Sequence, residues 1–144
     1  MNGKFQINGA DAYTLYGVLF LEGTLKELIR LPRRKEGYAR NWPDENGTER
    51  DLSVNAFESR ELTLPLLLIG SSRTDFNNKM AALENILTDD EIILDSIDLN
   101  RRFKLLYRQM NEITDLQYHP SGDCFAVFSL EMYDDYPTEK FDIV

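Results

Sequence analysis

The sequence predicts a β-rich α+β domain in which antiparallel strands form a β-sandwich or split barrel flanked by one main helix. Several segments alternate apolar and polar residues with the period of two that half-buried strands show. One segment, residues 71–91, repeats apolar residues at helical spacing. The 144 residues are 42% hydrophobic, which suits a single domain spanning residues 1–144.

The first elements are short. Residues 4–8, KFQIN, alternate like a strand, and residues 16–23, YGVLFLEG, form a second apolar run that ends at glycine. Thr24 suits the N-cap of a brief helix over LKELIRL, which Pro32 ends. Residues 32–52 are charged and turn-prone, without a period. So long a connection is uncommon in a compact domain unless it has a function or is disordered, so we expect a long loop or arm.

Residues 60–70, RELTLPLLLIG, form the most apolar of the predicted strands. The leucines at 62, 64, 66 and 68 share one face, and Thr63, Pro65, Leu67 and Ile69 share the other. Because both faces are largely apolar, we expect both to be covered. Pro65 cannot donate a ladder hydrogen bond, so the strand is expected at a sheet edge or with a bulge at this residue.

The main helix follows this strand. Its apolar stripe consists of Phe76, Met80, Leu83 and Leu87 with Ile86 beside them. Ser72 or Thr74 suits the N-cap. We expect this helix to lie on the sheet rather than to bind a cofactor.

The remaining segments are strand-like. They are residues 91–97, 101–110, 111–119 and 124–137, with a turn at HPSGD between the last two. In 101–110, the side chains of Phe103, Leu105 and Tyr107 fall on one face. Residues 138–144 are expected to form a short polar C-terminal tail.

The charge balance limits the functions available. With 25 acidic and 16 basic residues the net charge is −9, which argues against a protein that grips nucleic acid by its phosphates. The single Cys124 rules out an internal disulfide framework. No basic segment followed by an apolar run opens the chain, and no apolar run is long enough to span a bilayer. We therefore expect a soluble protein of a reducing cytoplasm.

Catalytic and metal-binding patterns are not found in the sequence. The only histidine, His119, precedes Pro120 in a turn, and Cys124 opens an apolar strand. The acidic residues of TDDEIILDSIDLN lack the glycine and terminal glutamate of a calcium loop. Asp134 and Asp135 are adjacent, so on a strand they face opposite ways. We therefore predict no enzyme activity, no cofactor and no metal site.

Basic residues cluster in two stretches. RLPRRKEGYAR holds Arg30, Arg33, Arg34, Lys35 and Arg40, and NRRFKLLYR holds Arg101, Arg102, Lys104 and Arg108. In an acidic chain such patches favour contact with acidic patches on a neighbouring copy, and head-to-tail contacts can close a ring.

Trp42, the only tryptophan, lies within the polar stretch RNWPDENGTERDLS. A large ring on an arm suits anchoring in a neighbouring subunit, and folding back over its own core is equally compatible. The candidate inter-subunit contacts are Arg33, Arg34, Tyr38, Arg40, Trp42, Pro65, Arg101 and Arg102.

Several of these stretches, in this order, resemble a known family. They are YGVLFLEGTLKELIRLPRRKE, ENGTERDL, ESRELTLPLLLIG, FNNKMAALENILT and FKLLYRQMNEI, closing on FSLEMYDDYP. The chain from about Tyr16 to Pro137 resembles tail proteins of long-tailed bacteriophages and prophages, nearest to the N-terminal ring-forming domain of distal tail proteins.

The resemblance implies a β-sandwich or split barrel, shared with tail-tube proteins, that assembles as a hexameric ring around the DNA channel. Residues 32–52 would reach toward neighbouring subunits, and acidic charge would suit a lumen through which DNA slides. The implied partners are other copies and the tube, tape-measure and hub proteins, with assembly in the bacterial cytoplasm and a final place in the virion tail. Many distal tail proteins carry a further C-terminal domain, which leaves a tail-tube or tail-completion (terminator) role open. A carbohydrate-binding β-sandwich, with Trp42, Tyr38 and Tyr118 as stacking surfaces, is the alternative from another class.

Overall fold

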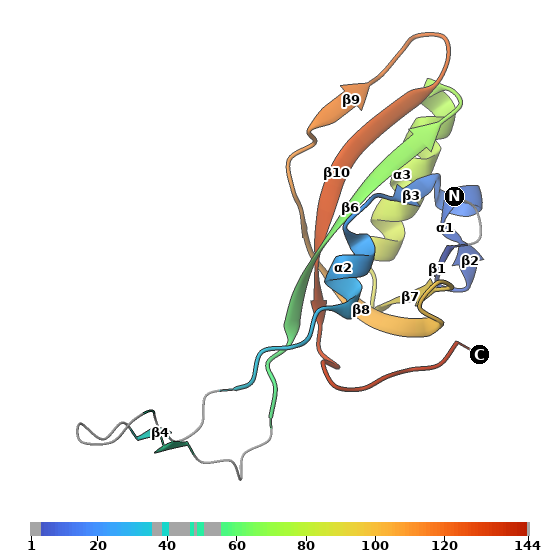
Figure 1. The fold of residues 1–144 in the computed structure, drawn as a ribbon. Coiled ribbons are helices and arrows are strands. Elements are labelled where there is room, and N and C mark those ends of the chain that lie inside the picture. The colour runs from blue at the N-terminus through green and yellow to red at the C-terminus, as the bar shows by residue number, and fades with distance from the viewer. Residues whose placement is uncertain (1–3, 36–38, 41–46, 48, 51–55, 144) are drawn as a thin grey trace.

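The structure is a computed structural model that describes residues 4–35, 39–40, 47, 49–50 and 56–143, with the backbone alone at 39–40 and 49–50 (Figure 1). The helices are α1 (Ala12–Tyr16), α2 (Thr24–Ile29) and α3 (Arg73–Leu87). The strands are β1 (Phe5–Ile7), β2 (Ala10–Asp11), β3 (Val18–Phe20), β4 (Ala39–Arg40), β5 (Glu49–Arg50), β6 (Arg60–Gly70), β7 (Ile92–Ser96), β8 (Arg101–Met110), β9 (Asp115–Gln117) and β10 (Cys124–Asp134).

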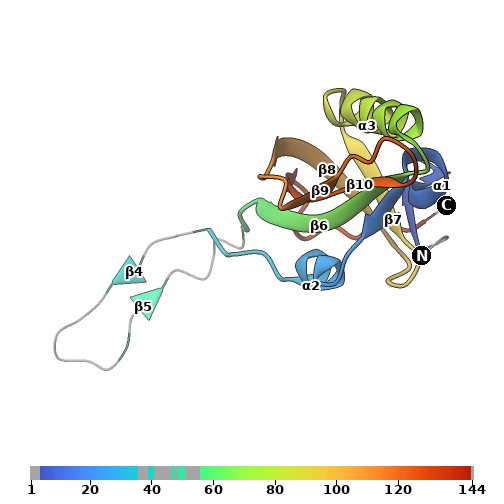
Figure 2. The ribbon, with the colours of Figure 1, turned by 90° about the horizontal axis from the view of Figure 1, so that it is seen from above.

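Eight of these strands form one curled antiparallel sheet. Its order is β2-β1-β7-β8-β10-β6-β3, with β9 beside β10. Helix α3, the main helix, lies along one side of β6 and β10, as the view from above shows (Figure 2). The predicted class, a β-rich α+β fold with one main helix, is confirmed.

The β6–β10 pair is the longest ladder of the sheet. Its register runs without interruption from Cys124 opposite Gly70 to Asp134 opposite Arg60. The other edge of β10 is shared, because β9 pairs with its first part and β8 with its last part. The β8–β10 register shifts between Glu131 and Met132, where β8 begins to curl away from the ladder.

The core lies between the inner face of the sheet and α3. The even-numbered leucines of β6, from Leu62 to Leu68, are fully buried, and Phe76, Leu83 and Leu87 of α3 are buried with them. The predicted helical stripe is therefore confirmed, as is the cap: Ser72 Oγ accepts a hydrogen bond from the backbone N–H of Asp75 at 3.1 Å.

Near the N-terminus, one helix was not predicted and one predicted cap is wrong. The sequence reading missed α1, which is only five residues long and is capped by Asp11, whose carboxylate accepts from the Thr14 N–H at 2.9 Å. Thr24 is not an N-cap. Gly23, with φ of 103°, takes that position, and the Thr24 hydroxyl instead donates to the Leu21 carbonyl at 2.9 Å.

The environment of β6 corrects the prediction made from Pro65. β6 has β10 on one side and β3 on the other, and its register passes Pro65 without a bulge, so the predicted edge or bulge is wrong. The Pro65 carbonyl accepts from the Leu21 N–H at 2.8 Å, one residue beyond the β3 register, which ends at Phe20 opposite Leu66. The Pro65 nitrogen lies on the same side of β6, where no paired strand requires a hydrogen bond from an N–H.

The C-terminal segment returns along β8. Arg102 donates its backbone N–H to the Phe141 carbonyl at 2.9 Å, forming an isolated bridge. The Phe141 ring packs edge-on against Tyr136, with centroids 5.5 Å apart, and Lys104 Nζ lies 4.2 Å from its centre. These contacts attach residues 138–143 to the body of the domain.

Candidate functional site

The outward face of the β6–β10 ladder carries a group of partly exposed apolar side chains. Alternation in β6 and β10 places Leu67 opposite Val127 and Ile69 opposite Phe125, and Leu19 of β3 lies beside Leu67. All five are only half-buried, whereas their sequence neighbours on the other face are buried. The expectation that both faces of β6 are covered is therefore wrong within one copy of the chain. We call these five residues the outward patch.

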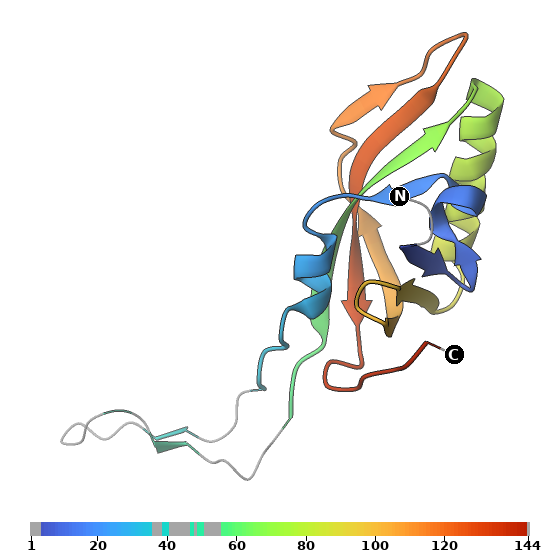
Figure 3. The ribbon, with the colours of Figure 1, turned by 45° about the vertical axis from the view of Figure 1, so that its right-hand side comes forward.

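The free edges of the sheet lie close to the outward patch. Among the residues that the structure describes, β3 ends the strand order and β9 pairs with β10 alone, so each presents backbone groups on one side. Below β3, helix α2 covers the edge of β6, because Glu27 accepts from the Thr63 N–H at 3.3 Å and Arg30 donates to the Glu61 carbonyl. Figure 3 shows α2 alongside this part of β6. A strand edge left open is a template for pairing with another chain.

The chain leaves the body between α2 and β6 as two antiparallel segments. Lys35 donates its N–H to the Ala56 carbonyl at 2.9 Å, and Glu58 donates to the Arg33 carbonyl at 2.7 Å. Farther along, β4 pairs with β5 (Figures 1 and 2). We call the paired segments 33–35 and 56–58 the arm root. The predicted arm at 32–52 stays a prediction, because much of that range lies outside the described residues.

The structure describes only some of the residues predicted to make inter-subunit contacts from the arm. Arg33 and Arg34 are exposed at the arm root, where the Arg34 guanidinium lies 5.2 Å from the centre of the Phe57 ring. Tyr38 and Trp42 fall outside the described residues, and Arg40 is described by its backbone in β4 alone. Their roles as inter-subunit contacts stay predictions.

The fold joins the two basic stretches at the arm root. Arg30, from the first stretch, and Arg101, from the second, line one pocket of about 330 Å³. Other members already have partners within the chain. Arg102 binds Asp95 at 2.8 Å, which raises the pKa of Arg102, and Arg108 binds Glu131 at 3.1 Å. That Arg102 contacts a neighbouring copy stays a prediction, with its guanidinium engaged in this pair.

A buried ion pair fixes the geometry of the arm root. The Arg60 Nη2 and Nε atoms donate to Asp134 Oδ2 at 2.6 and 2.8 Å. The remaining Arg60 nitrogen, Nη1, donates to the carbonyls of Leu28 at 2.9 Å and Arg30 at 2.5 Å. One guanidinium thus connects the end of α2, the first residue of β6 and the last residue of β10. Asp135, the next residue, is exposed and accepts from the Ser59 hydroxyl at 2.8 Å, so the two carboxylates face opposite ways as predicted.

Sequence reasoning did not single out Arg60, Lys140 or a role for Asp134 in ion pairing. Arg60 and Asp134 are separated by 74 positions and meet only through the β6–β10 register, which no local pattern reveals. Lys140 stood in a segment interpreted as a polar tail, yet it lines the same pocket as Arg30 and Arg101.

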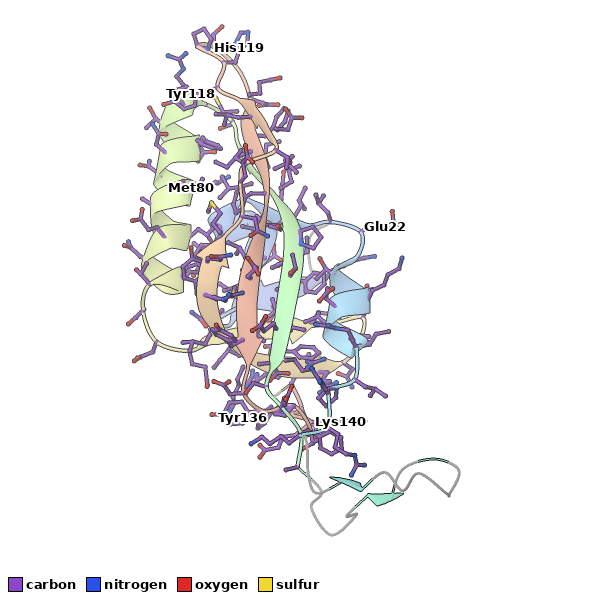
Figure 4. All side chains as sticks on the ribbon, turned by 90° about the vertical axis from the view of Figure 1, so that its left-hand side faces the viewer. Glu22, Met80, Tyr118, His119, Tyr136 and Lys140 are labelled. Carbon is purple, nitrogen blue, oxygen red and sulfur yellow. The ribbon has the colours of Figure 1, made fainter. Side chains whose placement is uncertain are left out.

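Tyr118 was considered as a sugar-stacking ring, but α3 occupies it. The Arg73 guanidinium lies 4.6 Å from the ring centre, Phe76 packs edge-on with centroids 6.0 Å apart, and the Tyr118 hydroxyl accepts from Asn77 at 2.9 Å. Tyr118 and His119 lie near the tip of the β9–β10 hairpin (Figure 4). The packing of Tyr118 suits holding that hairpin against α3.

The histidine and the cysteine that the sequence analysis considered for catalysis both have local contacts or burial that suit a structural role. His119 is exposed in the turn, where its Nδ1 accepts from the Ser121 N–H at 3.2 Å, and Cys124 is fully buried. Among the described residues, no cluster of three or more histidine, cysteine or acidic side chains could hold a metal ion. Within the same ranges, no helix has the length and apolar character needed to cross a membrane.

Comparisons with known proteins agree with this architecture. Neither the family models nor the curated protein sequences give a match. Among solved structures, the fold matches that of a phage distal tail protein, the kind of neighbour that the sequence resemblance predicted. It is the Dit protein (gp 19.1) of phage SPP1, described as a paradigm of the hub adsorption apparatus in phages that infect Gram-positive bacteria.

The match has a TM-score of 0.63 at 17% sequence identity and covers 93% of this chain and 50% of the SPP1 chain. The present chain thus spans about half the length of the structure it matches. At this identity the match shows a shared fold.

Proposed function

We propose that this chain is a structural component of a phage or prophage tail and forms a homo-oligomeric, hexameric ring at the distal tail or in the tail tube. The observation that carries the proposal is the fold shared with SPP1 Dit over 93% of this chain. Function inferred from fold is an inference by analogy, so it needs support from surfaces of this molecule.

That support comes from the outward patch and the free edges. Leu67, Val127, Ile69 and Phe125 form an apolar surface on the ladder, and the β3 and β9 edges lie on either side of it. A neighbour that covers the patch removes apolar area from water, and edge pairing fixes its orientation. When the contacting surfaces differ on the two partners, repeated contacts close into a ring at a suitable rotation.

The arm supplies the second contact in this proposal. A segment that leaves the body at Lys35 and returns at Ala56 can reach a neighbouring copy, and Trp42 would anchor it there. Arg33, Arg34, Tyr38 and Arg40 would accompany it, and Pro65, Arg101 and Arg102 would contact the neighbour from the body. In the tail, the further partners are the tube, tape-measure and hub proteins, after assembly in the bacterial cytoplasm.

The experiment compares the oligomeric state of three purified proteins by light scattering and by electron microscopy. We expect rings from the wild type and a shift to monomers for Leu67→Glu, because the interface would bury an unpaired carboxylate. The matched control is Leu15→Glu, an equal change at a residue 53% exposed on α1, which should assemble normally. A wild-type chain that stays monomeric alone and with its tail partners would overturn the proposal.

The arm and the carbohydrate-binding alternative are separated by Trp42→Ala. A ring anchor predicts weaker assembly and no change in glycan binding. A carbohydrate-binding module predicts loss of binding to a glycan array with the oligomer intact. Circular dichroism of the variant establishes that its body still folds.

A further inference from the structure

A pocket beside the arm root collects cations from four separate segments of the chain. Arg30 follows α2, Arg60 opens β6, Arg101 opens β8 and Lys140 belongs to the C-terminal segment, and all four line the same space of about 330 Å³. Figure 4 places Lys140 at the end of the body from which the arm leaves. We call this space the arm-root pocket.

The lining contains no carboxylate among the described residues, although the whole chain carries −9. Two of the cations have partners outside the lining, because Arg30 pairs with Glu27 at 3.3 Å and Arg60 with Asp134. Because Arg30 and Arg60 are already paired with carboxylates, Arg101 and Lys140 are the two charges in this pocket that a ligand can neutralise. Concentrated positive charge in an acidic protein attracts a complementary anion.

Arg101 carries a buried nitrogen atom without a partner among the described residues. This atom is Nε, and among the same residues Nη2 donates only to the Glu139 carbonyl at 3.3 Å. The guanidinium also lies 4.6 Å from the centre of the Phe103 ring. Burial, followed by the nearby charge of Arg60, lowers the pKa of Arg101 from its ordinary value. A buried donor without an acceptor is costly, so the described residues leave part of the hydrogen-bonding capacity of this guanidinium unused.

Apart from Thr138, the remaining lining is apolar, and it favours some anions over others. Ile29, Leu31, Pro32, Phe57 and Pro137 surround the cations, and Leu31 is 86% exposed. Gripping a nucleic acid backbone takes a row of exposed cations that follows successive phosphates. A compact group of cations among exposed apolar residues instead suits one acidic side chain with apolar neighbours.

We propose that the arm-root pocket binds the carboxylate of a glutamate or aspartate presented by an acidic peptide segment of another protein chain. The carboxylate accepts hydrogen bonds from the Arg101 guanidinium and the Lys140 ammonium, and the apolar neighbours of the acidic residue contact Leu31 and Phe57. This site stands whether or not the chain forms a ring, because it rests on the lining of a single copy.

The experiment is a titration followed by nuclear magnetic resonance of the arginine Nε–H groups. The Arg101 resonance is assigned by its loss in Arg101→Lys. The probes are the capped peptide Leu-Glu-Leu, the capped peptide Leu-Gln-Leu and inorganic phosphate. We expect a saturable shift of the Arg101 resonance with the glutamate peptide and none with the glutamine peptide.

Matched variants localise the effect. Arg101→Gln should weaken binding of the glutamate peptide by about tenfold or more, read from the Thr138 and Lys140 amides, because it removes a charged donor pair. Lys26→Gln, an equal charge change outside this pocket, should leave affinity within about twofold. Tighter binding of phosphate than of the peptide, equal binding of both peptides, or no shift with any probe would each overturn the proposal. Dispersed backbone spectra exclude unfolding as the cause.

Discussion

The Arg60 guanidinium and the Asp134 carboxylate form an ion pair in which both side chains are only 4% exposed. The pair stands at the last rung of the β6–β10 ladder, and Arg60 also holds the carbonyls that end α2. Asp134 Oδ1 accepts from the Tyr136 N–H at 3.0 Å, so the turn into the C-terminal segment depends on the same carboxylate. One buried charge pair thus organises three segments that meet at the arm root.

Removing one member of this pair should be strongly destabilising. We expect Asp134→Asn to lower the free energy of unfolding by about 3–5 kcal/mol, because it leaves the Arg60 charge buried without its counter-ion. The double variant Arg60→Met, Asp134→Leu should recover only part of that loss, since neither charge then needs solvation but the Leu28 and Arg30 carbonyls and the Tyr136 N–H lose their partners. Urea denaturation measures both. A single variant within about 0.5 kcal/mol of wild type would show that water reaches the pair.

The two faces of β6 should respond differently to truncation. Leu66→Ala should cost about 2–5 kcal/mol, because Leu66 is fully buried under α3. Leu67→Ala removes the same atoms from the outward patch and should cost far less when measured on monomers. A dependence of the Leu67→Ala cost on protein concentration would indicate that assembly buries this side chain. Equal costs in dilute protein would contradict the contrast between the two faces.

Gly70 should not tolerate a side chain. A Cβ there would lie 2.5 Å from the Phe76 nitrogen in the backbone of α3, so Gly70→Ala must displace the helix from the strand. We expect a loss of about 1–3 kcal/mol from this overpacking. Gly9→Ala is the control, because a Cβ at Gly9 meets nothing within 4 Å and the cost is only that of its φ of 86°, about 1–2 kcal/mol. Thermal unfolding compares the two variants, and we expect Gly70→Ala to have the lower melting temperature.

The start of α3 should contribute stability that depends on pH. The Asp75 carboxylate accepts from the Ser71 N–H at 2.9 Å and lies 3.2 Å from Lys79 Nζ. The first of these contacts, then the second, holds the pKa of Asp75 below its ordinary value of 3.8. The unfolded chain therefore binds more protons between the two pKa values. The contribution is complete above about pH 3.8 and is lost as the pH falls through the folded-state pKa.

Asp75→Asn tests this sign. The variant should be less stable than wild type at neutral pH, and the difference should shrink as the pH falls below 3.8. Ser72→Ala removes the neighbouring cap without a titrating group and should cost about 1 kcal/mol at either pH. Denaturation curves at neutral and acidic pH provide the measurement. A difference for Asp75→Asn that grows on acidification would contradict the assignment.

The sequence predicted the elements that its local periodicity encodes. The residues of β8 alternate so regularly that its bounds, 101–110, match the prediction, and the Phe76 to Leu87 stripe located α3. Short elements carry too few residues for a period to register, which is why α1 was missed. The prediction from Pro65 was wrong because the missing N–H of a proline matters only where a neighbouring strand would accept a hydrogen bond from it. The β3 register ends before Pro65, and the sequence does not show where β3 ends.

The candidate surfaces were only partly predictable. Both basic stretches were visible in the sequence, yet their meeting at Arg30 and Arg101 depends on long-range strand order. Lys140 joins them only because Phe141 attaches the C-terminal segment to β8. Conversely, the structure describes neither Tyr38 nor Trp42, so the sequence remains the basis for their proposed roles.

The uninterrupted β6–β10 register has a mechanical consequence. A pulling force applied to the segment between Lys35 and Ala56 enters the body at Arg60 and travels along the axis of β6. Because the ladder hydrogen bonds lie perpendicular to that axis, all the rungs from Arg60 to Gly70 resist in shear at once instead of unzipping singly. Tension that reaches Arg60 along β6 is therefore shared among these rungs rather than carried by one.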